Sequence, residues 1–234
     1  GNDSAHKLAI LSALAFGTKI DTDSIHLEGI SSITQEDLQA AEELGFRIKL
    51  LGVARRTDTG IEQRVTPTMV PLSSAMAGIP GVLNAVAVDG DEVGEIMLVG
   101  PGAGSTATAS AVAGDIVDIA RGAMRAPVFG IPAVDLVDYK PARMRAHEGG
   151  YYIRLAVYDR PGAFAAIAQR MAEQSISLES IMQKEKPDKQ DIKARHVVLI
   201  THETTELQIR TALQAIMDDG QIEGQPKMIR IEMP

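Results

Sequence analysis

The chain has 234 residues, a formal net charge of -8 and 45% hydrophobic residues, which is typical of one or two globular domains. It has no cysteine, which excludes disulfides, thiolate catalysis and cysteine-ligated zinc. Its acidic balance and its 3% content of aromatic residues argue against nucleic-acid binding. No apolar run reaches the about 20 residues that cross a bilayer, and the start of the chain lacks the basic segment of a signal peptide. We therefore expect a cytoplasmic protein that spans no membrane.

The first half of the chain is predicted to be a mixed α/β unit. Residues 4–16 have the apolar spacing of a helix, and residues 34–44 predict a second helix with Thr34 as its N-cap. Strand patterns bounded by turn residues predict a short strand and two hairpins, at 25–30, at 46–55 with 61–70, and at 82–88 with 94–99.

A glycine-rich segment, GPGAGS, begins at residue 100 and leads into a run of small residues. We expect a tight turn there, followed from about Thr106 by a helix that packs closely against a sheet. The segment does not fit the G-x-G-x-x-G fingerprint, and the βαβ unit that a dinucleotide-binding loop needs is missing from this sequence. By itself the segment is therefore not predicted to be a dinucleotide-binding loop.

The second half begins after a stretch that is poor in periodic patterns. Residues 125–149 contain three prolines, and we expect a linker there. The remaining 85 residues predict alternating strands and helices at 151–158, 161–174, 176–184, 196–201, 204–217 and 222–231. The order βαββαβ is the ferredoxin-like arrangement, in which two helices cover one face of a four-stranded antiparallel sheet.

Three segments of the first half, taken in order and spacing, resemble the homoserine dehydrogenase family. They are DSAHKLAILSALAFG from Asp3, GISSITQEDLQAAEELGFRIKLLGVA from Gly29, and GPGAGSTATASAVAGDI from Gly100. The resemblance implies an α/β (α+β) fold with a mixed-sheet substrate and dimerisation domain over 1–124. It also implies that the nucleotide-binding domain of the family is absent from this chain.

The segment after the linker, residues 150–234, resembles an ACT regulatory domain. The resemblance lies in a D-x-P-G turn and the strand after the next helix: Asp159, Arg160, Pro161 and Gly162, then Ile176, Leu178 and Ile181. Proline suits the first turn of a helix, glycine allows close approach, and Asp159 is expected to cap the helix. The N–H groups of such a helix start can hold a carboxylate.

The ACT resemblance implies an amino-acid effector at residues 159–162, with threonine as the hypothesis. The alternative is an ordinary strand-to-helix connection in a domain that only dimerises.

The pair Asp3 and Lys7 is the candidate catalytic and substrate-binding site. Residues four apart share one face of a helix. A lysine can polarise a carbonyl group and deliver a proton to its oxygen, and a carboxylate can hold a substrate ammonium group. The resemblance implies these roles for Lys7 and Asp3, and the alternative is a solvated ion pair.

The histidines are given no role. His6 faces about 100° away from Lys7 on the helix. The five histidines show no metal-ligand spacing, so no metal site is predicted.

The glycine turn also resembles the turn with which the family contacts the nicotinamide end of its cofactor. Gly102 is favoured for that contact, together with Gly100, Ala103 and Gly104. Glycines in such a turn allow a backbone to approach a ligand. The alternative is that they serve only the conformation of a strand-to-helix turn.

Taken together, the resemblance implies an NAD- or NADP-dependent oxidoreductase that interconverts L-homoserine and L-aspartate 4-semialdehyde in threonine, methionine and isoleucine biosynthesis. It also implies a homodimer or homotetramer. The fragment alone is expected to be inactive. The competing class is a non-enzymatic module that binds an amino acid and dimerises. Another ACT-bearing enzyme, such as a hydroxyacid dehydrogenase or an aspartate kinase, would not explain the lysine-bearing helix together with GPGAG.

Overall fold

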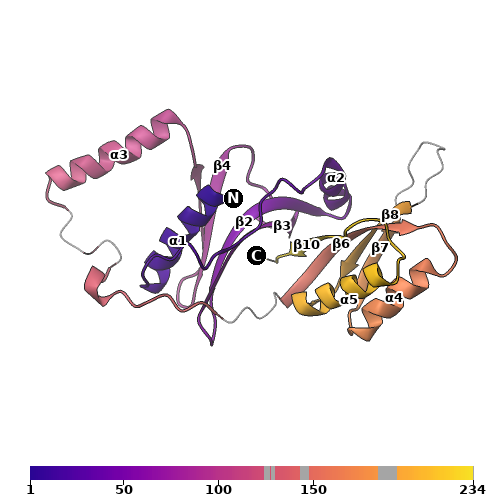
Figure 1. Ribbon diagram of the computed structural model, residues 1–234. Coiled ribbons are helices and arrows are strands. Elements are labelled where there is room, and N and C mark those ends of the chain that lie inside the picture. The colour runs from indigo at the N-terminus through magenta and orange to yellow at the C-terminus, as the bar shows by residue number, and fades with distance from the viewer. Residues whose placement is uncertain (124–126, 128–129, 143–147, 184–193, 234) are drawn as a thin grey trace.

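The computed structural model describes residues 1–123, 127, 130–142, 148–183 and 194–233. The α/β class predicted from the sequence is confirmed, because helices pack on a mixed sheet that runs through both halves of the chain (Figure 1).

The two helices predicted for the first segment are present. α1 (Asn2–Phe16) ends at Gly17, whose φ of 66° lies in the left-handed region that favours glycine. α2 (Gln35–Glu43) has Thr34 as its N-cap and closes a capping box with Asp37, since each side chain accepts from the other's backbone N–H. The end of α1 and the start of α2 therefore follow from the residues at these positions.

The first predicted hairpin forms the main pair of strands in the N-terminal half. β2 (Phe46–Arg56) and β3 (Ile61–Pro71) pair antiparallel along their whole length, whereas β1 (His26–Leu27) is shorter than expected and lies parallel to β3. α1 packs on this hairpin. The buried side chains of Ala5, Leu8 and Ala9 on the helix form a cluster with Ile25 and with Val65 of β3.

The second predicted hairpin stands apart as its own sheet. β4 (Leu83–Gly90) and β5 (Gly94–Pro101) pair only with each other, and α3 (Ser105–Ala120) follows without a buried residue. Figure 1 shows α3 extending away from the main sheet. Large apolar side chains therefore remain exposed, namely Val88, Ile96, Leu98, Val99, Val112, Ile116 and Ile119. The close packing expected of α3 is not found within the described part of the chain.

The stretch predicted as a linker contains a single short element in its described part, the 3-10 helix η1 (Ala133–Asp135). It runs back along the N-terminal half, since Val137 bridges to Thr18 and Pro141 bridges to Ile61.

The C-terminal half has the predicted βαββαβ order. It comprises β6 (Glu148–Tyr158), α4 (Ala163–Glu173), β7 (Leu178–Gln183), β8 (Ala194–Thr201), the two-residue β9 (Thr204–Thr205), α5 (Glu206–Asp218) and β10 (Lys227–Ile231). The strand order is β10-β6-β8-β7, and all neighbours are antiparallel. One core joins the two helices to this sheet, with Leu155, Ile167, Leu199, Ile209 and Ile216 at its centre.

The two halves share one sheet, which the sequence did not predict. β10 runs parallel to β3, with Arg230 beside Thr68 and Ile231 beside Met69. Just beyond β10, the backbone N–H of Glu232 donates to the carbonyl of Met69 at 3.0 Å. The last strand of the C-terminal half therefore completes an edge of the N-terminal sheet.

α2 covers the second face of the C-terminal sheet, opposite α4 and α5 (Figure 1). Its Ala40 and Ala41 pack against Tyr152, Val198 and Ile200. In this way a helix of the first half and two helices of the second enclose the same sheet.

Polar contacts also join α2 to the C-terminal sheet. The buried carboxylate of Asp37 accepts from the Arg154 Nε at 2.8 Å and from the Tyr152 hydroxyl at 3.1 Å, and Glu36 pairs with the ring of His196. Burial alone would raise the pKa of Asp37, but its hydrogen bonds from Arg154 and Thr34 outweigh this and hold the pKa below its usual value.

Candidate functional site

The ion pair predicted on the first helix is formed. The Lys7 Nζ lies 2.8 Å from a carboxylate oxygen of Asp3, and the two side chains are 48% and 82% exposed. The hydrogen bond and the positive charge of Lys7 lower the pKa of Asp3. Both charged groups are thus open to solvent and to a ligand, on the side of α1 that faces away from Leu8 and Ala9 in the core.

The glycine turn joins β5 to α3. Gly100 lies near the end of β5, and Gly104 is the N-cap of α3 with φ 117° and ψ 145°. No side chain caps this helix start, so its first backbone N–H groups keep their capacity to donate. Ala103 and Gly102 lie between them and are exposed.

The lysine and the glycine turn belong to different elements of the fold. α1 packs on β2 and β3, whereas β4 and β5 pair only with each other. Within the described residues no interaction joins Lys7 to the turn, and neither lines either of two shallow surface hollows. In the described residues, the two parts of the predicted site therefore make no direct interaction with each other.

The D-x-P-G turn differs from the prediction in one respect. Asp159 does not cap α4, because its carboxylate accepts from the Arg195 Nε at 2.9 Å instead. The N-cap is Gly162, whose φ of 87° requires a glycine-like conformation, and the helix begins two residues later than expected. The Arg160 guanidinium lies over the Tyr158 ring at 4.6 Å.

This turn leaves the start of α4 without a side-chain acceptor. The Ala163 N–H donates to the Arg160 carbonyl at 3.2 Å, so the turn is closed on itself. The next N–H groups of the helix receive no capping hydrogen bond from a side chain, so they keep their capacity to donate to an anion.

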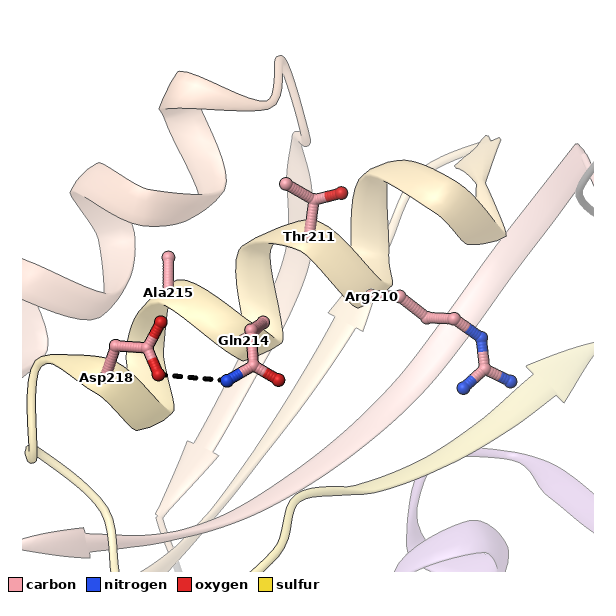
Figure 2. Close-up of a pocket in the computed structure, with 5 residues that line it drawn as sticks. All are labelled: Arg210, Thr211, Gln214, Ala215 and Asp218. Carbon is pink, nitrogen blue, oxygen red and sulfur yellow. Dashed lines mark hydrogen bonds between the residues drawn. The ribbon is translucent and has the colours of Figure 1, made fainter.

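A hollow on α5, with a volume of about 480 Å³, was not predicted. Figure 2 shows its five lining side chains along one helix, Arg210, Thr211, Gln214, Ala215 and Asp218. The polar groups already pair locally, because Gln214 donates to Asp218 at 2.9 Å and Arg210 pairs with Glu206. The hollow therefore offers little unused hydrogen-bonding capacity to a ligand.

No helix in the described residues combines the length and the apolar character that a membrane crossing requires. No group of three or more metal-ligating side chains is found in the described parts of the chain.

Comparison with known proteins agrees with these features. The pattern of the family described as homoserine dehydrogenase matches residues 1–117, and the pattern described as ACT domain matches residues 151–221. The homoserine dehydrogenase of Neisseria gonorrhoeae is 42% identical and that of Pseudomonas aeruginosa 40% identical, each over 99% of this chain and 54% of the relative. The chain therefore spans about half the length of the curated relatives that it matches.

A solved structure gives the same result. The homoserine dehydrogenase from Thiobacillus denitrificans is 41% identical to this chain and superposes with a TM-score of 0.86, over 99% of this chain and 53% of that one. The family pattern, the relatives and the shared fold together show that the chain belongs to the homoserine dehydrogenase family and carries an ACT domain.

Proposed function

We propose that the full-length protein interconverts L-homoserine and L-aspartate 4-semialdehyde with NAD or NADP. Family membership supports the reaction, and one observation in this chain carries its chemistry: an exposed lysine and an exposed carboxylate lie 2.8 Å apart on one helix. A bound nicotinamide would supply or accept the hydride.

The side chains of α1 account for the remaining steps. In the reducing direction, Lys7 Nζ hydrogen-bonds to the substrate carbonyl oxygen and donates the proton that this oxygen needs as the hydride arrives at carbon. In the oxidising direction, the neutral amine takes that proton back. Asp3 accepts a charge-assisted hydrogen bond from the substrate ammonium group and so orients the carbonyl toward Lys7.

The glycine turn fits a cofactor contact. An added Cβ at Gly100 would meet no atom within 4 Å, so the backbone there is open to a ligand. We assign cofactor contact to Gly100, Gly102, Ala103 and Gly104. Residues 1–234 alone should be inactive, since the relatives are about twice as long and this sequence contains no βαβ nucleotide-binding unit.

The test of this function is replacement of Lys7 by alanine in the full-length protein. We expect Lys7→Ala to lower kcat for aspartate semialdehyde reduction by about 10²–10⁴-fold, the usual contribution of general acid–base catalysis. Thermal unfolding should not change, since the lysine side chain is half exposed. A matched control is Lys19→Ala, which removes another exposed lysine–aspartate pair, with Asp138, and should leave turnover unchanged. Equal turnover of Lys7→Ala and the wild type would refute the assignment.

The ACT domain is proposed to bind an amino acid, with L-threonine as the candidate effector, at Asp159, Arg160, Pro161 and Gly162. The uncapped start of α4 supports a carboxylate there. Isothermal calorimetry should show binding of L-threonine and a raised melting temperature, with D-threonine as the control. Absence of both heat and thermal shift at millimolar L-threonine would remove threonine from the proposal.

The exposed apolar faces of β4 and β5 are proposed to contact a second copy in a homodimer or homotetramer, because uncovered apolar surface of this kind marks interfaces. The second candidate function is a non-enzymatic amino-acid-binding and dimerisation module, and it is favoured by the lack of a direct interaction between Lys7 and the glycine turn in the described residues. It predicts threonine binding and dimers without turnover by the full-length protein.

A further inference from the structure

The three glycines of the turn at residues 100–104 differ in what a side chain would meet at each position. Gly104 adopts φ 117°, which a side chain would strain. Gly102 has no such angle, but an added Cβ would lie 1.9 Å from Nδ2 and 2.2 Å from Cγ of Asn84. Gly100 has neither constraint, since the space beside it is open.

Asn84 reaches the turn from the neighbouring strand. In the β4–β5 register Asn84 lies opposite Gly100, and Leu83 lies opposite Pro101. The Asn84 carboxamide therefore extends past the end of β5 and occupies the place that a side chain on Gly102 would need. Because the strands pair along their full length, the hairpin fixes the backbone of Asn84, and its exposed carboxamide lies against the turn.

We propose that Asn84 is a positioning residue of the cofactor-binding turn. Its carboxamide supports the backbone at Gly102 and so sets the position of the turn, while the open backbone at Gly100 faces the ligand. Gly102 thus leaves the room that the Asn84 carboxamide occupies. The inference rests on the proposed function, in which this turn contacts the nicotinamide cofactor.

This arrangement predicts a coupling between two substitutions. Gly102→Ala forces the new methyl group into the carboxamide, so either Asn84 or the turn must move. Asn84→Ala removes the carboxamide and creates the space that the methyl group needs. Residues in contact show non-additive effects, whereas independent residues do not.

The experiment is a double-mutant cycle in the full-length protein, with KM for NADPH or NADH and kcat measured for the wild type, both single variants and the double variant. We expect Gly102→Ala to raise the KM for the cofactor by a few-fold, because the new methyl group displaces the Asn84 carboxamide from the turn. Asn84→Ala should raise it by a few-fold, and Asn84→Ala/Gly102→Ala should match Asn84→Ala within about twofold. The change in kcat should be smaller throughout.

Gly114→Ala provides the control, because Gly114 lies in α3, has open space around it and should leave KM unchanged. If the double variant shows the product of the two single effects, the positioning role is wrong. It is also wrong if Asn84→Ala changes kcat and KM no more than Gly114→Ala does.

The same four proteins separate this inference from the proposed function. If the wild type does not reduce aspartate semialdehyde, the proposed reaction fails. The contact can then still be read from melting temperatures: Gly102→Ala should lower the value, and Asn84→Ala should restore it in the double variant. Additive melting temperatures together with additive KM values would overturn the inference, even in an active enzyme.

Discussion

Asp37 shows how one side chain can serve a helix and a domain junction at once. Its carboxylate closes the capping box of α2 and also accepts from Arg154 and Tyr152 of β6. The capping role was readable from the spacing of Thr34 and Asp37. The contact with β6 was not, because it joins residues more than a hundred positions apart.

Asp37→Asn tests the strength of that contact. It removes the nearer of the two carboxylates that pair with Arg154, while Glu36 remains at 3.6 Å. We expect the free energy of unfolding at pH 7 to fall by about 2 kcal/mol, the usual contribution of a hydrogen bond to a charged group. The folded-state pKa of Asp37 lies below the value of about 3.9 for an unfolded aspartate. Its stabilising contribution is therefore present above that pH and is lost as the pH falls through the folded value.

Urea denaturation of the wild type and Asp37→Asn across pH 2–7 measures this directly. The difference between the two proteins should shrink below about pH 4. Asp138→Asn, which changes an exposed carboxylate paired with Lys19, is the control and should not alter the midpoint. A difference that stays constant over the whole pH range would contradict the role given to the charge of Asp37.

At the scale of elements, the sequence predicted what local patterns determine. Helix periodicity and caps gave α1 and α2, turn residues gave both hairpins, and the βαββαβ order followed from alternation. Asp159 was wrongly expected to cap α4, because the sequence could not show that Arg195 on a distant strand takes its carboxylate. For the same reason the pairing of β10 with β3 was missed, since parallel partners carry no local signal.

The candidate site was predictable only in part. The Asp3–Lys7 pair follows from helical spacing and is present. Asn84 was passed over because a single amide in the apolar run LNAVAV has no distinctive pattern. Only the register of β4 with β5 reveals that it lies against Gly102.

In the whole molecule the ACT half and the N-terminal half form one structural unit. β3 lies under α1 at Val65 and beside β10 at Met69, and α2 covers the ACT sheet. Arg230 of β10 is buried and pairs with Glu28 of the first half and Glu206 of the second. The two halves therefore share both apolar and ionic contacts.

This sharing predicts a single unfolding transition. Calorimetry of residues 1–234 should show one peak whose measured enthalpy equals the van't Hoff enthalpy, because the cluster around Met69, Tyr152 and Ile231 contains residues of both halves and is lost when either half unfolds. Two resolved peaks would show that the halves unfold independently and that the shared sheet contributes little to stability.

The pairing of β3 with β10 also has a consequence for biosynthesis. On the ribosome, β3 is made long before β10, since more than half of the chain separates them. Until β10 emerges, the edge of β3 around Thr68 and Met69 is a strand edge without its partner, which is the kind of surface that joins to other nascent chains. This edge of β3 therefore stays uncovered until translation has passed through the ACT segment.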